Sequence, residues 1–128
     1  MSNVDRVRGI YQAFDAGGIE AIVEHLHPDV EGRVAPELSP EPDTYRGLEG
    51  VRRWFAGFEG SIDDVRIEPA DFVEDGERVL VPISLKGRGA GSGIEVTQEA
   101  VQAWTFRDGK VARVDGYPDM ESAREGSS

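Results

Sequence analysis

The spacing of the apolar residues changes near the middle of this chain. In the first part they recur every three or four positions, which is the period of a helix that packs one face on a core. The first such stripe consists of Val4, Val7, Tyr11 and Phe14. In the second part the spacing falls to two, as in a strand. Helices followed by consecutive strands predict an α+β domain whose sheet is mostly antiparallel.

Three helices are expected in the first part. Ser2 and Asp5 form a plausible capping pair at the start of the first helix, and Gly17-Gly18 ends it because glycine accepts the left-handed backbone that closes a helix. A second, short helix has Ile19, Ile22, Val23 and Leu26 on one face and ends at His27-Pro28. The third helix is predicted over 47–59.

The remaining segments are predicted as strands and loops. Val30, Gly32 and Val34 alternate with polar residues as in a short strand, and the proline-rich residues 35–46 are interpreted as a loop. Later strands are expected at 62–74, 78–86, 94–106 and 111–117, with turns at 75–76, 87–93 and 108–109. A short helix follows Pro118-Asp119, and the last residues are expected to fray.

Length and charge limit the classes of function. The 128 residues suit a single domain, 1–128, with a real core. The net charge of −11 argues against nucleic acid and anionic membrane surfaces as partners, because both are polyanions. Without cysteine the chain has no disulfide and no thiolate nucleophile. Since neither an export signal nor an apolar run of about 20 residues is visible, we expect a cytoplasmic protein.

Several short motifs in a fixed order resemble one superfamily. They lie at residues 14–18, 45–51, 87–93, 104–111 and 117–119. Together they resemble the nuclear transport factor 2-like superfamily, and most closely its SnoaL-like polyketide cyclase branch. The resemblance implies a cone-shaped barrel, in which a curved, mostly antiparallel sheet wraps around the N-terminal helices. It also implies a small apolar ligand, proton-transfer chemistry without a cofactor in those members that are enzymes, and frequent homodimers.

Strand alternation predicts which residues line the cone. On 78–86 the inward set is Val79, Val81, Ile83 and Leu85; on 94–106 it is Ile94, Val96, Ala100, Trp104 and Phe106, together with Gln102. We predict a ligand pocket lined by Tyr11, Phe14, Trp54, Phe58, Ile83, Leu85, Gln102, Trp104 and Val114. The two tryptophans are equally compatible with a purely structural place in the core.

The acids that the resemblance implies are missing from their positions. Steroid isomerases of this superfamily carry a catalytic aspartate on the first strand and a hydrogen-bonding acid on the long fourth strand, and these positions match Gly32 and Gln102. Their catalytic tyrosine matches Ile10, next to Tyr11. The aspartate of the epoxide hydrolases matches Gly116.

Glu31 and His27 remain as weak candidates for a catalytic base near the pocket mouth. His27 next to a helix end is more often a dipole partner or a solvated cap. No metal site is predicted, because His25 and His27 diverge on a helix. Arg113 and Asp115, two apart on one strand face, are interpreted as a solvated or dimer-facing ion pair.

Two functions are compatible with these features. In the first, the protein binds a small apolar molecule in the cone, and isomerises, cyclises or dehydrates it if it is an enzyme, with Gln102 polarising an oxygen of the substrate. In the second, it is a noncatalytic dimerisation or protein-interaction module. The small outward residues Val101, Ala103 and Thr105 suit sheet-on-sheet contact in a homodimer.

Overall fold

The computed structural model describes residues 2–34, 44–59 and 62–125. Its N-terminal elements are α1 (Asn3–Gly17), α2 (Ile19–Ile22), a 3-10 turn (Val23–His25), β1 (Leu26–Val34), β2 (Thr44–Arg46) and α3 (Gly47–Glu59). Its C-terminal elements are β3 (Ile62–Pro69), β4 (Val73–Asp75), β5 (Arg78–Gly89), β6 (Glu95–Arg107), β7 (Lys110–Tyr117) and α4 (Met120–Glu125). The helix at 47–59 and the strands near 78–86, 94–106 and 111–117 agree with the sequence predictions.

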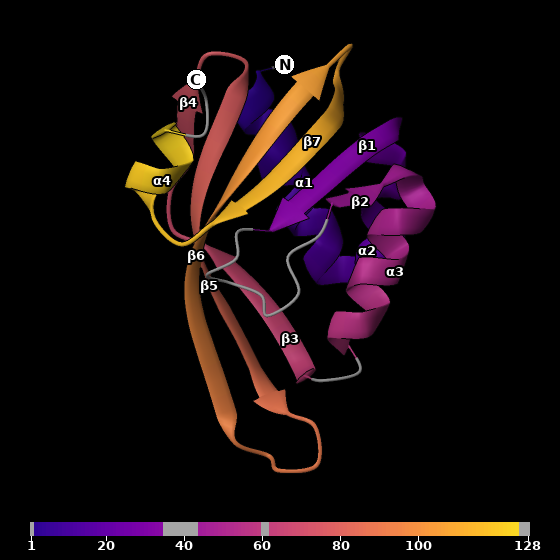
Figure 1. Ribbon diagram of the computed structural model, residues 1–128, viewed down its shortest axis with the longest axis vertical. Coiled ribbons are helices and arrows are strands. Elements are labelled where there is room, and N and C mark those ends of the chain that lie inside the picture. Colours follow the sequence, from indigo (N-terminus) through magenta and orange to yellow (C-terminus); the bar gives the residue numbers. More distant parts are fainter. Residues whose placement is uncertain (1, 35–43, 60–61, 126–128) are drawn as a thin grey trace.

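The strands form a single open sheet in the order β2-β1-β7-β6-β5-β3, with β4 also paired to β5. The pair of β1 and β7 is parallel and the other pairs are antiparallel. Helices α1, α2 and α3 lie on one side of this curved sheet, whereas α4 lies on the other side (Figure 1). The predicted α+β class, with a mostly antiparallel sheet around N-terminal helices, is confirmed.

Helix α1 begins and ends where the sequence predicts. The Asp5 backbone N–H donates to Ser2 Oγ at 3.1 Å, and the Ser2 N–H donates to the Asp5 carboxylate at 3.4 Å. At the other end, Gly18 has a φ of 72°, and its N–H donates to the Phe14 carbonyl at 2.8 Å. The capped helix buries Val7, Ile10 and Tyr11 against the sheet, which sets the position of Tyr11.

Two segments near the cone differ from the prediction. The second helix ends at Ile22, and Leu26, His27 and Pro28 belong to β1, because Leu26 pairs with Val111 of β7. Thr44–Arg46, predicted as part of a loop, is the strand β2, which pairs with β1. The rest of the predicted loop, residues 35–43, lies outside the described residues.

The predicted strand at 62–74 is two strands. β3 ends at Pro69, and the Ala70 N–H donates to the Pro82 carbonyl at 2.8 Å. β4 begins at Val73 and, like β3, pairs with β5.

The core has two parts, one on each face of the sheet. The inner part joins α1 and α2 to the sheet, and its fully buried members include Val7, Val30, Val79, Val81 and Val111. The outer part consists of Leu80, Val101 and Ala103, which pack against Ala123 of α4. The inward set predicted for 78–86 is therefore correct at Val79, Val81 and Ile83, all of them buried in the inner cluster.

The C-terminal helix α4 covers the sheet face that was predicted to mediate self-association. Val101 is 3% exposed and Ala103 is fully buried beneath α4. Arg78 holds this helix, since its guanidinium donates to the Ala123 carbonyl at 2.8 Å and to Asp75 at 3.0 Å. The expectation that Val101 and Ala103 form a sheet-on-sheet dimer contact is therefore wrong, because their surface is already used within the chain.

The β5–β6 hairpin extends beyond the helices (Figure 1). Ile94 is 68% exposed and Val96 is 39% exposed. Both residues were expected to face the core, and that expectation is wrong. Alternation predicts the face of a strand on which a side chain lies, but it does not predict where along the strand the core ends.

Candidate functional site

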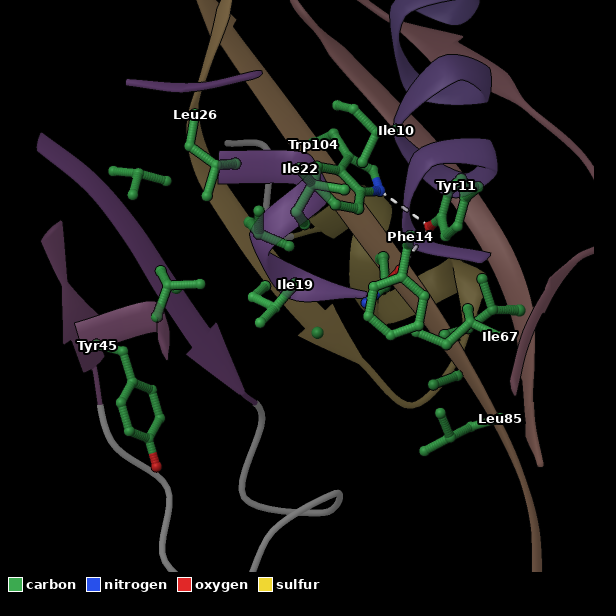
Figure 2. A pocket seen from close by; sticks show the side chains of 18 of the residues that line it. Ile10, Tyr11, Phe14, Ile19, Ile22, Leu26, Tyr45, Ile67, Leu85 and Trp104 are labelled. Atoms are coloured by element: carbon green, nitrogen blue, oxygen red, sulfur yellow. Dashed lines mark hydrogen bonds between the residues drawn. The ribbon is translucent and has the colours of Figure 1, made fainter. Parts of the chain in front are cut away.

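A cavity of about 230 Å³ lies between the N-terminal helices and the inner face of the sheet. Of the nine residues predicted to line a pocket, seven line this cavity: Tyr11, Phe14, Ile83, Leu85, Gln102, Trp104 and Val114. The side chains of the other two, Trp54 and Phe58, lie outside the described residues. Figure 2 shows Tyr11 and Trp104 on one side of the cavity and Tyr45 on the opposite side.

Most of the cavity wall is hydrocarbon. Helical side chains come from Ile10, Phe14, Ile19 and Ile22, and strand side chains include Leu26, Val30, Ile67 and Ala100. The sequence prediction missed Tyr45, because it lies in β2, a strand hidden in a proline-rich segment. It also missed Ile19 and Ile22, although their helical spacing was visible and gave a signal for an inward face.

Three polar side chains form a hydrogen-bonded row at the wall. The Trp104 indole N–H donates to the Tyr11 hydroxyl oxygen at 3.0 Å, as Figure 2 shows. The Tyr11 O–H donates to Oε1 of Gln102 at 2.5 Å. The rings of Tyr11 and Trp104 meet edge to face, with centroids 5.7 Å apart, which fixes the direction of the row.

The Tyr11 phenol acts as a donor and not as a base. Burial raises its pKa above the ordinary value of 10.0, and the hydrogen bond from Trp104 opposes this shift in part. The phenol therefore keeps its proton at neutral pH. A group of this kind stabilises negative charge on a neighbouring oxygen but does not accept a proton from carbon.

The two candidate bases lie outside the cavity wall. Glu31 sits on β1 between Val30 and Gly32, which line the cavity, but it is not itself among the described residues of the wall. Its carboxylate lies 3.8 Å from Nε of Arg46, and its side chain is 42% exposed. His27 accepts the Asp29 N–H at 3.0 Å on Nδ1, and its Nε2 lies 3.1 Å from the Arg107 guanidinium. Their described partners also lie outside the wall, at Arg46, Asp29 and Arg107.

The positions where the resemblance implies catalytic acids do line the cavity. They are Gly32, Gln102 and Gly116. A Cβ built on Gly32 would meet only the Tyr45 Cβ, at 4.0 Å, so the glycine leaves open space there. Among the described residues of the wall there is no aspartate, glutamate or histidine. The wall therefore offers hydrogen bonds and apolar contact, with no described group that accepts a proton at neutral pH.

Asp115 is more buried than the sequence suggested. Its carboxylate, 8% exposed, lies 2.9 Å from Nε of Arg113 and 3.7 Å from Nε of Arg33. The carboxylate of this pair is thus buried, whereas the side chain of Arg113 is 37% exposed. Arg33 lines the cavity, but its guanidinium contacts this carboxylate, which is not part of the described wall. The cluster connects β1 with β7 where the two strands run parallel.

No group of three or more potential metal ligands occurs in the described residues. No helix in the described part of the chain is long and apolar enough to span a membrane.

The family model of the SnoaL-like domain matches residues 7–114. The chain belongs to this family. The match includes α1 from Val7 onward, the whole of β6 and the cavity residues up to Val114. No match was found among curated proteins.

Several solved structures share the fold over nearly the whole chain. TerC, co-crystallised with polyporic acid, is 28% identical with a TM-score of 0.78, and the match covers 96% of this chain and 95% of that chain. An NTF2-like protein of unknown function from Burkholderia pseudomallei is 26% identical with a TM-score of 0.81, covering 98% and 97%. A candidate polyketide cyclase from Sinorhizobium meliloti is 25% identical with a TM-score of 0.68, covering 88% and 93%.

Proposed function

We propose that this SnoaL-like protein binds a small apolar molecule, of a polyketide-like or aromatic kind, in the cavity between α1 and β6. The observation that carries the proposal is the apolar wall around about 230 Å³ of space, interrupted by the Trp104–Tyr11–Gln102 row. A concave apolar site with a few placed polar groups is the usual form of a small-molecule site.

The comparisons support the class of ligand. TerC was co-crystallised with polyporic acid, an aromatic quinone, and it is similar to this chain over nearly its full length. A volume of about 230 Å³ is small for a ligand site, since such sites usually measure about 300–1,000 Å³. A compact and flat molecule therefore suits this cavity better than a long one.

Binding is better supported than conversion of the ligand by a base. Isomerisation, cyclisation and dehydration each require a proton acceptor next to the reacting carbon. The described wall has no carboxylate or histidine, and the pKa of Tyr11 is raised by burial. The described wall would act on a ligand by polarising one of its oxygens through hydrogen bonds, as at an oxyanion hole.

The alternative function, a dimerisation module, has lost its main support. It depended on Val101, Ala103 and Thr105 as an open sheet face; Val101 and Ala103 pack beneath α4, and Thr105 is half-buried.

Two ligands test the proposal: polyporic acid, and the smaller flat ketone 9-fluorenone. Calorimetric titration should give one site per chain for at least one of them. Ala100→Phe and Gly32→Leu should abolish binding by filling the cavity, because both residues line it. Thr97→Phe is the matched control, since it puts the same ring on an exposed position of β6. The proposal fails if the wild type binds neither ligand, or if the filled variants bind as the control does.

A further inference from the structure

The amide of Gln102 is held in one orientation by its neighbours. An indole N–H can only donate, so the Tyr11 oxygen accepts the hydrogen bond from Trp104. The Tyr11 O–H then donates elsewhere, and Oε1 of Gln102 is its acceptor at 2.5 Å. Because an amide nitrogen donates and only the amide oxygen accepts, a Tyr11 O–H that donates to Gln102 meets the oxygen end of the amide.

The other end of the amide is a free donor. The two N–H groups on Nε2 of Gln102 have no hydrogen-bond partner in the described residues. Within that part of the chain, the buried side-chain polar atom that lacks a partner is Nε of Arg78, so Nε2 of Gln102 is not sealed among packed atoms. Since Gln102 lines the cavity, the cavity is the space that its amide nitrogen reaches.

The side chains that flank this donor on β6 supply no acceptor. Ala100 and Trp104 flank Gln102 on the same face of β6, and Ile10 and Val114 also belong to the wall. An apolar ligand that displaces water here leaves the amide N–H groups without a partner, and leaving a buried donor unpaired is costly. A ligand that brings an acceptor oxygen satisfies them.

We propose that the cavity selects flat apolar ligands that carry a neutral acceptor oxygen, such as a ketone or quinone carbonyl, at the end held by Gln102. Gln102 determines this specificity by donating from Nε2. Tyr11 is a positioning residue, because its hydroxyl fixes the amide and keeps the nitrogen directed at the ligand. The inference rests on the proposed function, since it assumes that an apolar ligand enters the cavity.

Fluorene and 9-fluorenone provide a matched pair of probes. The two molecules have nearly the same flat shape, and the ketone adds a single acceptor oxygen. The wild type should bind fluorenone about fivefold more tightly than fluorene, the factor that one net neutral hydrogen bond provides. The ratio of the two affinities is the readout, because a change that only loosens the fold weakens both ligands together.

Three variants locate the donor. Gln102→Leu removes the amide and should bring the ratio to about one, with fluorene still bound. Tyr11→Phe keeps the amide but releases its orientation, so the ratio should fall between those of the wild type and Gln102→Leu. Gln98→Leu removes the other amide of the wall and should leave the ratio near fivefold. The carbonyl stretch of bound fluorenone should lie at lower frequency in the wild type than in Gln102→Leu.

The outcomes distinguish a failure of the proposed function from a failure of this inference. If neither probe binds the wild type, the proposed function fails for compact ligands and this inference fails with it. If both probes bind with equal affinity, the cavity takes apolar ligands but the inference is wrong. If Gln98→Leu removes the preference and Gln102→Leu does not, the assignment of the donor is wrong. A ratio that falls in Gln102→Leu and Tyr11→Phe but not in Gln98→Leu supports the inference.

Discussion

Replacing Tyr11 with phenylalanine removes the central member of the hydrogen-bonded row and leaves the ring. Trp104 is only 5% exposed, and its indole N–H then has no acceptor. Oε1 of Gln102 loses its donor at the same time. An unpaired buried donor destabilises the fold by about 1–3 kcal/mol. Removal of the hydroxyl offsets part of this loss, because the hydroxyl no longer has to be desolvated. We expect a loss of about 2 kcal/mol in the free energy of unfolding, or roughly 8 °C in Tm for a chain of this size.

Urea denaturation at neutral pH measures this loss. An unchanged slope of the unfolding free energy against urea concentration shows that the folded state is intact. Tyr117→Phe is the matched control, because the described residues give its hydroxyl no hydrogen-bond partner, and it should stay within about 0.5 kcal/mol of the wild type. A double-mutant cycle with Trp104→Phe should give a coupling of about 1 kcal/mol. Tyr11→Phe unfolding within 0.5 kcal/mol of the wild type would refute the reasoning.

Two further predictions follow from burial. Because the pKa of Tyr11 is raised above 10.0 in the folded state, its contribution to stability is complete below pH 10 and is lost as the pH rises further, when the unfolded chain releases the proton first. Urea titrations between about pH 9 and 11 should therefore show the wild type losing up to about 1.4 kcal/mol per pH unit more than Tyr11→Phe, and parallel curves would contradict this. Leu80→Ala, beneath α4, should cost about 3 kcal/mol, whereas Val96→Ala on the exposed hairpin should cost less than about 0.5 kcal/mol; equal losses would show that α4 does not bury Leu80.

The sequence predicted the elements whose signals are local. The cap at Ser2, the end of α1 at Gly18 and the helix 47–59 depend on residues within a few positions of one another, and all agree with the structure. Where the helices cover β5 and β6, the inward residues followed from alternation, because one face of each strand is buried there; Ile94 and Val96 lie outside that part. Seven of the nine predicted pocket residues line the cavity: five lie on strands and followed from alternation, whereas Tyr11 and Phe14 lie on α1 and followed from the helical period.

The differences arise where the deciding contact is distant in sequence. Leu26 has a helical spacing from Ile22, yet it joins β1 because it pairs with Val111, which a local pattern does not reveal. Val101 and Ala103 were assigned to an open outer face because the sequence of their own strand does not indicate that α4 covers them. The row of Tyr11, Gln102 and Trp104 joins residues about 90 positions apart, so its hydrogen bonds required the folded chain.

The claim that the cavity is a ligand site is tested most directly by a crystal structure of the protein with 9-fluorenone. We predict the ligand between α1 and β6, with its carbonyl oxygen about 3 Å from Nε2 of Gln102 and its rings against Phe14 and Trp104. A ligand bound elsewhere on the surface, with the space beside Gln102 closed by side chains, would contradict the account.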